Sequence, residues 1–330
     1  MSTGENTMAV LGAGPVGSIL AAGLASAGQD VLLIESAPSR AQQLCERGLE
    51  VSGTMTMASR SFTILRSLEE LRNHKPMALF ICTKTWTLKT ILPELQKVLH
   101  PGTVVVSFQN GIGPEDEVGK FFPPDRVARG TVNYAGGVSP ADGTVSLLWF
   151  TPPNYLGPLK NAGLPVLDTL AAVMNKAGLT TEVVPTYDVK KLTFFKTILN
   201  SALSALCATS GITMRQAMTY VHTKHLADIL IREGLSVAAA LGYHYGEDAR
   251  EYCIAYLMRG GDHMPSMWVD LQNKCPTEIE YINGKIAKAG LSFENINVDA
   301  NVFLTSMVIT QEIKSGVRAP DDIPEYLRHF

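Results

Sequence analysis

Hydrophobic positions along the chain follow two different patterns, and the change falls near residue 185. Before it, short apolar runs alternate with amphipathic stretches of helical period, as in buried parallel strands connected by helices. The strands predicted from these runs are 8–11, 30–35, 77–82, 103–108, 127–132 and 180–184. The helices predicted between them are 18–27, 38–47, 88–99 and 164–177, with a helical turn at 68–73. Alternating positions at 49–65 indicate short strands or a hairpin, and glycine- and proline-rich loops on both sides predict a hairpin at 144–150.

From Tyr187 onward nearly every stretch has helical period. The helices predicted there are 187–208, 222–241, 247–259, 266–273, 277–289 and 298–314. The residues from Arg318 are polar and proline-rich, which predicts a loose tail. The change of pattern predicts an α/β Rossmann-type dinucleotide-binding domain at 1–185, followed by an all-α C-terminal domain at 186–330.

Composition narrows the class of protein. The chain has 330 residues, which is long for one domain and sufficient for two. Its net charge of −3 gives no reason to expect a nucleic-acid partner. The five cysteines are scattered and form no CxxC pair, which predicts neither a disulfide framework nor a metal site and fits a reducing compartment. Residues 1–7 lack a signal-peptide pattern, and no apolar run approaches the roughly 20 residues that span a bilayer, so a cytoplasmic protein without membrane contact is expected.

The clearest motif is a glycine-rich turn between the first predicted strand and the first predicted helix. It consists of Gly12, Ala13, Gly14, Pro15, Val16 and Gly17. In a dinucleotide-binding unit the first glycine permits the tight turn, the second lets backbone approach a pyrophosphate, and the third lets helix pack against strand. The helix N-terminus adds N–H donors and partial positive charge. The alternative is an ordinary glycine turn, which the flanking strand and helix disfavour.

Glu35 ends the second predicted strand, 18 residues after Gly17. A carboxylate at this place normally accepts hydrogen bonds from the adenosine ribose hydroxyls and repels a 2′-phosphate, so it favours NADH over NADPH. Arg40 is close enough in the sequence to work against that preference. The alternative for Glu35 is a solvated acid at a strand end.

Lys84 and Asn110 each follow a predicted buried strand. Ligands of open α/β sheets collect at the carboxyl ends of strands, so both side chains are candidates to face a cofactor bound on the glycine turn. The alternatives are a solvent-exposed loop lysine for Lys84 and simple turn chemistry for Asn110, which precedes a glycine.

The helical half supplies further candidates. Lys196 and Asn200 are four residues apart on one helical face, and Ser204 follows four residues later. A lysine in this apolar helix needs a partner or a cleft, although a snorkelling surface lysine is the alternative. Ser266 stands at a predicted helix start, where a carboxylate could bind or where the serine could simply cap the helix. Glu278 opens another predicted helix and, taken alone, fits an interaction with the helix dipole.

Together these residues resemble the ketopantoate reductase family, the 2-dehydropantoate 2-reductases, over roughly residues 8–315. The resemblance rests on the glycine turn, Lys84, Gln109-Asn110-Gly111, Gly130-Thr131, the pair Lys196 and Asn200, and the blocks Pro265-Ser266-Met267 and Thr277-Glu278-Ile279-Glu280-Tyr281-Ile282-Asn283-Gly284. The last block, with its spacing from serine to glutamate, is the specific part. The family implies a Rossmann domain, then a helical domain, with the active site in the cleft between them.

The resemblance also implies roles for the candidate residues. Lys196 resembles the general acid that protonates the keto oxygen, and Asn110 the residue that positions nicotinamide and substrate. Asn200 and Ser266 resemble substrate ligands, with Ser266 bound to the carboxylate. Glu278 resembles the acid that hydrogen-bonds the substrate hydroxyl or the lysine.

Two positions depart from the family pattern. Ser204 stands where the family often has asparagine, which removes one amide from the substrate-binding group. Glu35-Ser36 stands where NADPH-using members usually carry a basic residue, so the family implies NADPH while Glu35 favours NADH.

The implied activity is NAD(P)H-dependent reduction of ketopantoate to pantoate, a step of pantothenate biosynthesis. A related enzyme acting on another 2-oxo or 3-hydroxy acid, and a catalytically idle dinucleotide-binding protein, stay open as alternatives. The apolar helical half could equally bury a dimer surface, so a homodimer is considered.

Overall fold

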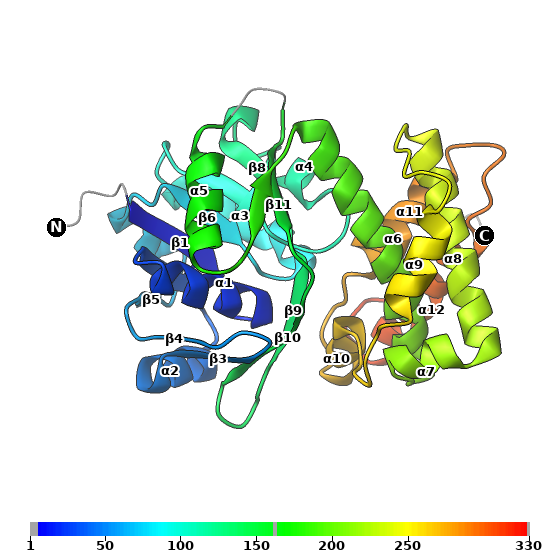
Figure 1. Cartoon of the computed structure of the whole chain (residues 1–330), viewed down its shortest axis with the longest axis horizontal. Helices are drawn as coiled ribbons and strands as arrows, with labels where there is room; N and C mark the ends of the chain where they lie inside the picture. Colours follow the sequence, from blue (N-terminus) through cyan, green and yellow to red (C-terminus); the bar gives the residue numbers. More distant parts are fainter. Residues whose placement is uncertain (1–5, 161–163, 329–330) are drawn as a thin grey trace. The chain divides into compact units, whose positions relative to one another are not determined.

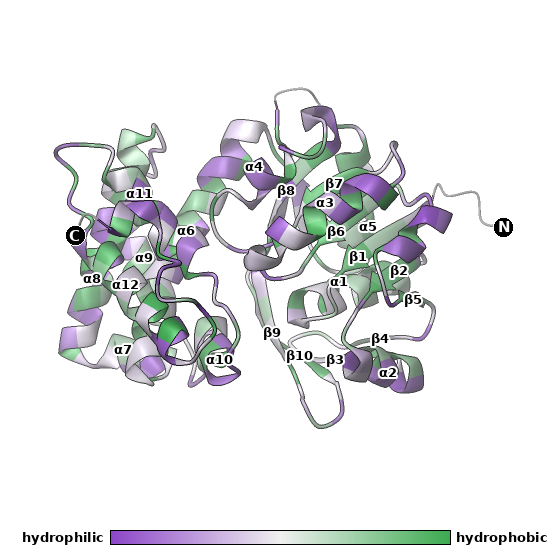
Figure 2. Cartoon of the chain, turned by 180° about the vertical axis from the view of Figure 1, so that it is seen from behind, coloured by the Kyte–Doolittle hydropathy of each residue, from purple (hydrophilic) through white to green (hydrophobic). Residues whose placement is uncertain are grey.

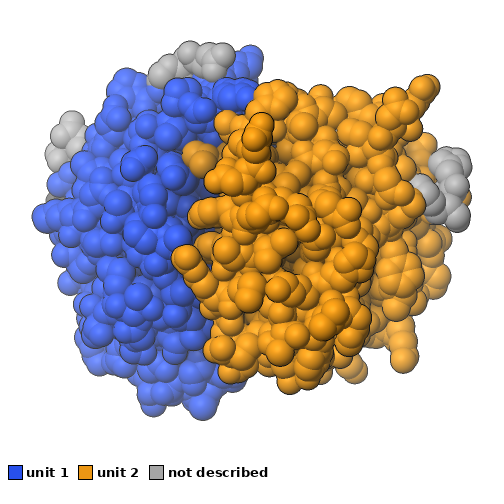
Figure 3. All heavy atoms as spheres, turned by 45° about the vertical axis from the view of Figure 1, so that its right-hand side comes forward, with its two compact units in different colours: residues 1–109, 113–190 blue, residues 110–112, 191–330 orange. Residues whose placement is uncertain are grey.

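The structure is a computed structural model that describes residues 6–160 and 164–328 of the chain. It contains two compact units, and Figure 3 colours them separately. Residues 1–109 and 113–190 form unit 1, and residues 110–112 and 191–330 form unit 2. The chain passes from unit 1 to unit 2 between Lys190 and Lys191, inside one helix, and the strip Asn110–Ile112 belongs to unit 2.

Unit 1 is built on an eight-stranded sheet in the order β12-β11-β8-β7-β6-β1-β2-β5 (Figure 1). All neighbours in it pair in parallel except β8 and β11, which are antiparallel. Its strands are β1 (Thr7–Leu11), β2 (Asp30–Ile34), β5 (Thr63–Leu65), β6 (Ala78–Ile81), β7 (Val104–Ser107), β8 (Val127–Thr131), β11 (Asn154–Pro158) and β12 (Thr181–Val183). The predicted Rossmann-type α/β arrangement is therefore confirmed, including the change of strand order beside β1 that marks the usual ligand edge.

A second, four-stranded sheet in the order β4-β3-β10-β9 also belongs to unit 1. Its strands are β3 (Leu49–Gly53), β4 (Met57–Ser59), β9 (Tyr134–Val138) and β10 (Val145–Phe150). The segment 144–150, predicted to be a hairpin, is instead the single strand β10, which forms an antiparallel hairpin with β9. The alternation at 49–65 gives β3, β4 and the edge strand β5. The helices of unit 1 are α1 (Pro15–Ser26), α2 (Pro38–Arg47), α3 (Leu88–Val98), α4 (Pro114–Val118) and α5 (Val166–Lys176), with 3₁₀ turns η2 (Glu69–Asn73), η3 (Thr85–Thr87) and η4 (Pro124–Arg126).

The large sheet has a hydrophobic core on each face. Along β1, Met8 and Val10 pack in one core with α1, α5 and the small sheet, while Ala9 and Leu11 pack in another core that includes leucines of α3. Successive strand residues point to opposite faces, so both faces of a covered strand must be apolar. This explains the continuous apolar runs, which Figure 2 shows as hydrophobic colouring of the central strands. Each fully buried leucine contributes about 1.5–3 kcal/mol.

Unit 2 is helical, as predicted. Its elements are α6 (Thr186–Ser210), which starts in unit 1, α7 (Met214–Thr219), α8 (Val221–Ala240), α9 (Ala249–Leu257), α10 (Ser266–Gln272), η5 (Ile279–Tyr281), α11 (Asn283–Gly290), α12 (Asp299–Lys314) and η6 (Glu325–Leu327). Among the described residues, α6 is the one helix long and apolar enough to cross a membrane by length and composition. Because 61% of that apolar window is buried, it also has the character of a core helix of a soluble protein.

Three features of unit 2 differ from the prediction. Helix α7 is not predicted by periodicity because it is short, but Thr213 and Gln216 form a capping box that a search for helix starts would have found. The helix predicted at 277–289 is wrong, since η5 and α11 are separated at Ile282. The break has a physical reason, because the carbonyl of Tyr281 accepts the N–H of Ile112 instead of continuing a helix.

The predicted loose tail is also wrong. Arg318 is largely buried and forms ion pairs with Glu280 and Glu312. Tyr326 and Leu327 pack against the core of unit 2. The polar composition of the segment misled the prediction because its arginine is satisfied by carboxylates of other elements.

Candidate functional site

The three glycines of the turn at the end of β1 each meet the constraint expected of them. Gly12 has a φ of +99°, and a Cβ there would lie 2.9 Å from Cγ2 of Thr83. A Cβ on Gly17 would lie 2.0 Å from the carbonyl oxygen of Gly12, so only glycine allows α1 to approach the turn this closely. Gly14 faces open space, and no side chain caps the helix N-terminus that it begins. An open backbone edge with uncapped N–H groups fits a pyrophosphate.

The carboxylate of Glu35 is fixed on this turn. Its Oε2 accepts the N–H of Ala13 at 3.0 Å, and its Oε1 accepts the N–H of Ala37 at 2.8 Å. Each carboxylate oxygen can accept more than one hydrogen bond, so the group can still bind a hydroxyl of a ligand. Glu35 is therefore an oriented group beside the glycine turn and not a freely solvated acid.

Arg40 lies on the same turn, and each of its donor nitrogens has a partner. Nε donates to the carbonyl of Ala13 at 3.1 Å, Nη2 to Oγ of Ser18 at 3.1 Å, and Nη1 to the carbonyl of Gly143 at 2.7 Å. Burial lowers the pKa of Arg40, and the nearby charge of Glu35 acts in the opposite direction. The guanidinium thus joins the turn to the tip of the β9–β10 hairpin.

Lys84 lies just after β6, at the same edge of the sheet as the glycine turn. Its neighbour Thr83 is close to Gly12 and accepts a hydrogen bond from Nε2 of Gln109 at 2.9 Å. Gly12, Glu35 and Lys84 therefore come from the carboxyl ends of three neighbouring strands, β1, β2 and β6. Lys84 is half-buried, so it is not the fully exposed loop lysine of the alternative interpretation.

In unit 2, Lys196 and Asn110 meet. Nζ of Lys196 donates to Oδ1 of Asn110 at 3.0 Å, although the two residues are 86 positions apart in the chain. Both are half-buried. Asn200 and Ser204 follow Lys196 at successive turns of α6 and are half-buried as well. Nζ of Lys196 is therefore held by an amide, which distinguishes it from a snorkelling surface lysine.

Glu278 and Ser266 occupy different environments. Glu278 is only 4% exposed and directly precedes η5, so it is not the exposed first-turn acid of a long helix. Ser266 is the exposed first residue of α10, and Pro265 occupies the cap position without a side-chain hydrogen bond. The serine therefore has no capping role in this structure.

Sequence reasoning missed a contact that holds Asn110. The N–H of Ile112 donates to the carbonyl of Tyr281 at 2.9 Å. Gly111, between Asn110 and Ile112, has a φ of +84°, and a Cβ there would lie 2.4 Å from the carbonyl oxygen of Tyr281. The glycine after Asn110 was a signal of a close approach, but its partner could not be read from the sequence.

Sequence reasoning also missed a buried ion pair in unit 1. Arg129 in β8 is 2% exposed, and its Nη1 lies 3.2 Å from Oε2 of Glu115. Its Nη2 donates to the carbonyl of Gln109 at 2.8 Å. An arginine inside a predicted buried strand was the available signal, because a buried charge requires a partner.

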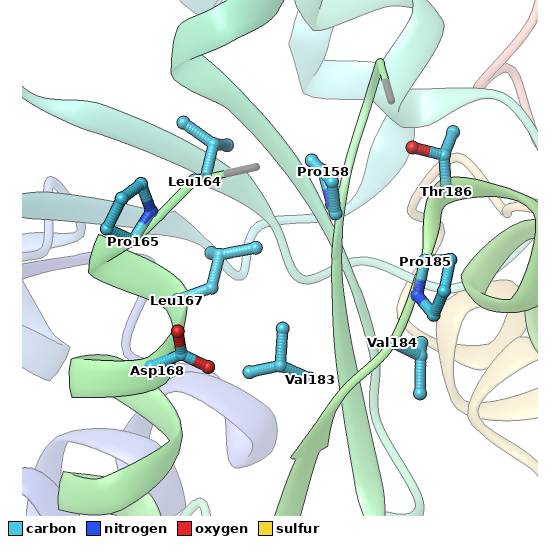
Figure 4. A pocket seen from close by; sticks show the side chains of 9 residues that line it. All are labelled: Pro158, Leu164, Pro165, Leu167, Asp168, Val183, Val184, Pro185 and Thr186. Carbon is cyan, nitrogen blue, oxygen red and sulfur yellow. The ribbon is translucent and has the colours of Figure 1, made fainter. Parts of the chain in front are cut away.

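A separate hollow of about 480 Å³ lies beside α5, β11 and β12 (Figure 4). Its lining is mainly apolar, with Asp168 and Thr186 as polar members. None of the residues predicted to bind cofactor or substrate lines it, so it is not the candidate site.

The fold and the glycine turn define a protein of the dinucleotide-binding Rossmann class. Two family models then match the sequence: "Ketopantoate reductase PanE/ApbA" over residues 8–161 and "Ketopantoate reductase PanE/ApbA C terminal" over residues 188–312. The chain belongs to the ketopantoate reductase family, as the sequence resemblance indicated.

Curated relatives extend over nearly the whole chain. The 2-dehydropantoate 2-reductase of Archaeoglobus fulgidus is 25% identical over 311 residues, covering 93% of this chain and 98% of the relative. That of Pyrococcus abyssi is 26% identical over 308 residues, with the same coverage. The family and these relatives support reduction of a 2-oxo acid.

Solved structures share the fold. D-mandelate dehydrogenase, solved with NADH and anilino(oxo)acetate, matches with a TM-score of 0.83 at 24% identity, over 94% of this chain and 100% of its own. A PanE/ApbA family ketopantoate reductase from Ralstonia eutropha matches with a TM-score of 0.82 at 23% identity, over 94% and 99%. At this identity the likeness concerns the fold alone.

Proposed function

We propose that this protein reduces ketopantoate to pantoate with NADH, and that Lys196 is the proton donor. The observation that carries the proposal is the hydrogen bond from Nζ of Lys196 to Oδ1 of Asn110. It unites the two residues to which the family resemblance assigns proton donation and positioning of the reactants. The curated relatives named 2-dehydropantoate 2-reductase support the choice of substrate.

The chemistry follows from the charge that develops during reduction. The nicotinamide coenzyme that the glycine turn and Glu35 would hold would supply the hydride, and charge would then develop on the keto oxygen. The ammonium of Lys196 would stabilise that charge and pass one proton to the oxygen. An ammonium has three N–H donors, and Asn110 accepts one of them, which fixes the direction of the others.

The remaining site residues would orient the substrate. The side chain of Asn200, one turn from Lys196, makes no hydrogen bond to another described residue, so its amide is available to a ligand. The exposed hydroxyl of Ser266 at the start of α10 would bind the substrate carboxylate. Glu278 would accept a hydrogen bond from the product hydroxyl or from the lysine.

The proposal of NADH rests on Glu35, beside which Arg40 lies. The carboxylate held at the end of β2 would bind the ribose hydroxyls and repel a 2′-phosphate. Arg40, the basic residue that could have favoured NADPH, is engaged by Ala13, Ser18 and Gly143. These hydrogen bonds fix the orientation of the guanidinium but leave one N–H of Nη2 for a ligand, so the preference for NADH depends mainly on the charge of Glu35.

A second candidate function is reduction of a different 2-oxo acid, and Ser204 favours it. The family often carries asparagine at this position, and a serine is shorter and offers one fewer donor. D-mandelate dehydrogenase, which shares the fold, shows by its name that the fold also serves a 2-hydroxy acid other than pantoate. Ser204 is therefore the position at which substrate choice would change.

The test is a comparison of initial rates. The purified protein is assayed with NADH and with NADPH against ketopantoate and a panel of linear, branched and aryl 2-oxo acids. The proposal predicts the highest kcat/KM with NADH and ketopantoate. A higher value with another 2-oxo acid supports the second candidate, and tight NADH binding without turnover of any acid overturns both.

A further inference from the structure

We infer that the segment after α12 serves the active site: Arg318 is a positioning residue that clamps the loop 277–282, which carries Glu278. The inference rests on the proposed function, because the loop matters for turnover only if Glu278 and Lys196 act on a substrate. The contacts that support it all lie within unit 2.

The clamp is a pair of carboxylates bridged by one guanidinium. Oε1 of Glu312, in the last turn of α12, accepts both the N–H and the hydroxyl of Thr277 at 2.7 Å. Oε2 of the same carboxylate accepts Nε of Arg318 at 2.7 Å, and Nη2 of Arg318 donates to Glu280 at 2.6 Å. Glu278, between Thr277 and Glu280, is therefore held from both sides.

The end of the same loop supports the contact between Lys196 and Asn110, which we call the lysine centre. The carbonyl of Tyr281 accepts the N–H of Ile112, and the strip Asn110–Ile112 places Asn110 against Nζ of Lys196. A displacement of the loop would thus move Glu278 directly and Asn110 through the backbone of its strip. Both residues need to be placed correctly for the proposed reaction.

The burial and charge of Glu312 explain why position 318 is an arginine. Glu312 is 1% exposed, and a buried carboxylate is costly without a positive partner. The planar guanidinium can bind two carboxylates through different nitrogens at fixed angles, which an ammonium cannot reproduce. Nη1 of Arg318 also donates to the carbonyl of Asp322 at 3.0 Å, which ties the following residues to the clamp.

The segment is anchored again beyond the clamp. Tyr326 packs against the core, and its hydroxyl oxygen would lie 2.6 Å from a Cβ on Gly284, the second residue of α11. Burial raises the pKa of Tyr326 above the ordinary tyrosine range. The segment after α12 is therefore held at two points. Arg318 holds it to the loop 277–282, and Tyr326 packs it against α11.

The experiment compares Arg318→Gln with Arg328→Gln. Arg328 is a matched control in the same segment, because among the described residues its side chain donates to the carbonyls of Asp321 and Ile323 and to no carboxylate. Hydrogen–deuterium exchange of peptides covering 277–282 and steady-state kinetics are measured for both. Arg318→Gln is expected to speed exchange in the loop and to lower kcat roughly ten- to a hundredfold, as misplacement by about 1 Å can do. The KM for NADH is expected to stay unchanged, because the glycine turn belongs to unit 1.

Equal exchange and equal kcat in the two variants would overturn the inference, and so would faster exchange with intact kcat. If Arg318→Gln does not fold, Glu280→Gln replaces it, since this variant removes only the more exposed carboxylate and is expected to give a smaller loss of the same kind. Wild-type protein that reduces no 2-oxo acid would end the proposed function but not the clamp. Faster loop exchange in Arg318→Gln would then still support the clamp, and unchanged exchange would overturn it.

Discussion

Two regions of the molecule are built in opposite ways. The nucleotide edge of unit 1 consists of the glycine turn, Glu35 and Arg40, and the lysine centre of unit 2 consists of Lys196 and Asn110. The glycine turn is one contiguous stretch whose function depends on backbone geometry, and Glu35 and Arg40 follow it within a short distance in the chain. The lysine centre joins residues that are 86 positions apart. The turn is therefore visible as a motif, whereas the centre exists only once α6 has packed beside the strip that carries Asn110.

Both regions are supported by an arginine that binds a buried carboxylate. In unit 1, Arg129 pairs with Glu115 and holds the carbonyl of Gln109. In unit 2, Arg318 pairs with Glu312, which holds Thr277. Removing one partner of such a pair would leave a buried charge, so substitution of either arginine is expected to be costly.

The largest effect is expected at the lysine centre. Lys196→Ala should lower kcat roughly 10²- to 10⁴-fold, because it removes the proposed proton donor. Affinity for NADH, measured by fluorescence titration, should change little. Lys190→Ala is the control, since Lys190 lies on the same helix but pairs with Asp116 of unit 1. A Lys196→Ala enzyme that keeps the wild-type rate would show that the catalytic assignment is wrong.

At the glycine turn, two alanine substitutions separate folding from binding. Gly17→Ala places a Cβ 2.0 Å from the carbonyl oxygen of Gly12 and should destabilise the fold by about 1–3 kcal/mol. Gly14→Ala adds a methyl in open space, so it should leave the thermal unfolding temperature unchanged and weaken only NADH binding. Thermal denaturation and calorimetric titration distinguish the two. Equal destabilisation by both substitutions would contradict the packing argument.

A smaller effect is expected for coenzyme choice. Glu35→Gln retains an oxygen that can accept the N–H of Ala13 but removes the charge that repels a 2′-phosphate. The ratio of kcat/KM for NADH to that for NADPH should fall about tenfold, which corresponds to about 1.4 kcal/mol. Glu50→Gln, at an exposed position of β3, serves as the control. An unchanged ratio would remove Glu35 from the argument for NADH.

The smallest effect is expected at the hairpin tip that Arg40 contacts. Hydrogen bonds from the side chain of Ser139 and from Thr144, together with the charge of Arg47, lower the pKa of Asp142 to about 2. Because the folded pKa is below the unfolded value of about 3.9, the stabilisation is present above about pH 4 and is lost as pH falls toward 2. The difference in unfolding temperature between wild type and Asp142→Asn should therefore be constant near neutral pH and shrink below about pH 4. A difference that does not depend on pH would contradict this account.

The order of elements was predictable because it depends on local periodicity. Continuous apolar runs correctly indicated the covered strands β1, β6 and β7, and helical spacing indicated α3, α8 and α12. The errors at α7 and at Ile282 have different causes. Helix α7 is short, and the break at Ile282 follows from a hydrogen bond to Ile112 that no local pattern reveals.

For the candidate site, the sequence by itself determined the glycine turn, the acid at the end of β2 and the presence of Lys196 on an apolar helix. These depend on allowed backbone angles and on the spacing of neighbours along one element. Only the tertiary structure decided that Lys196 binds Asn110, that Arg40 is engaged by the hairpin, and that Arg318 bridges Glu280 and Glu312. Hydrogen bonds and ion pairs depend on separations of a few ångströms between residues far apart in the chain, and such separations are set by packing.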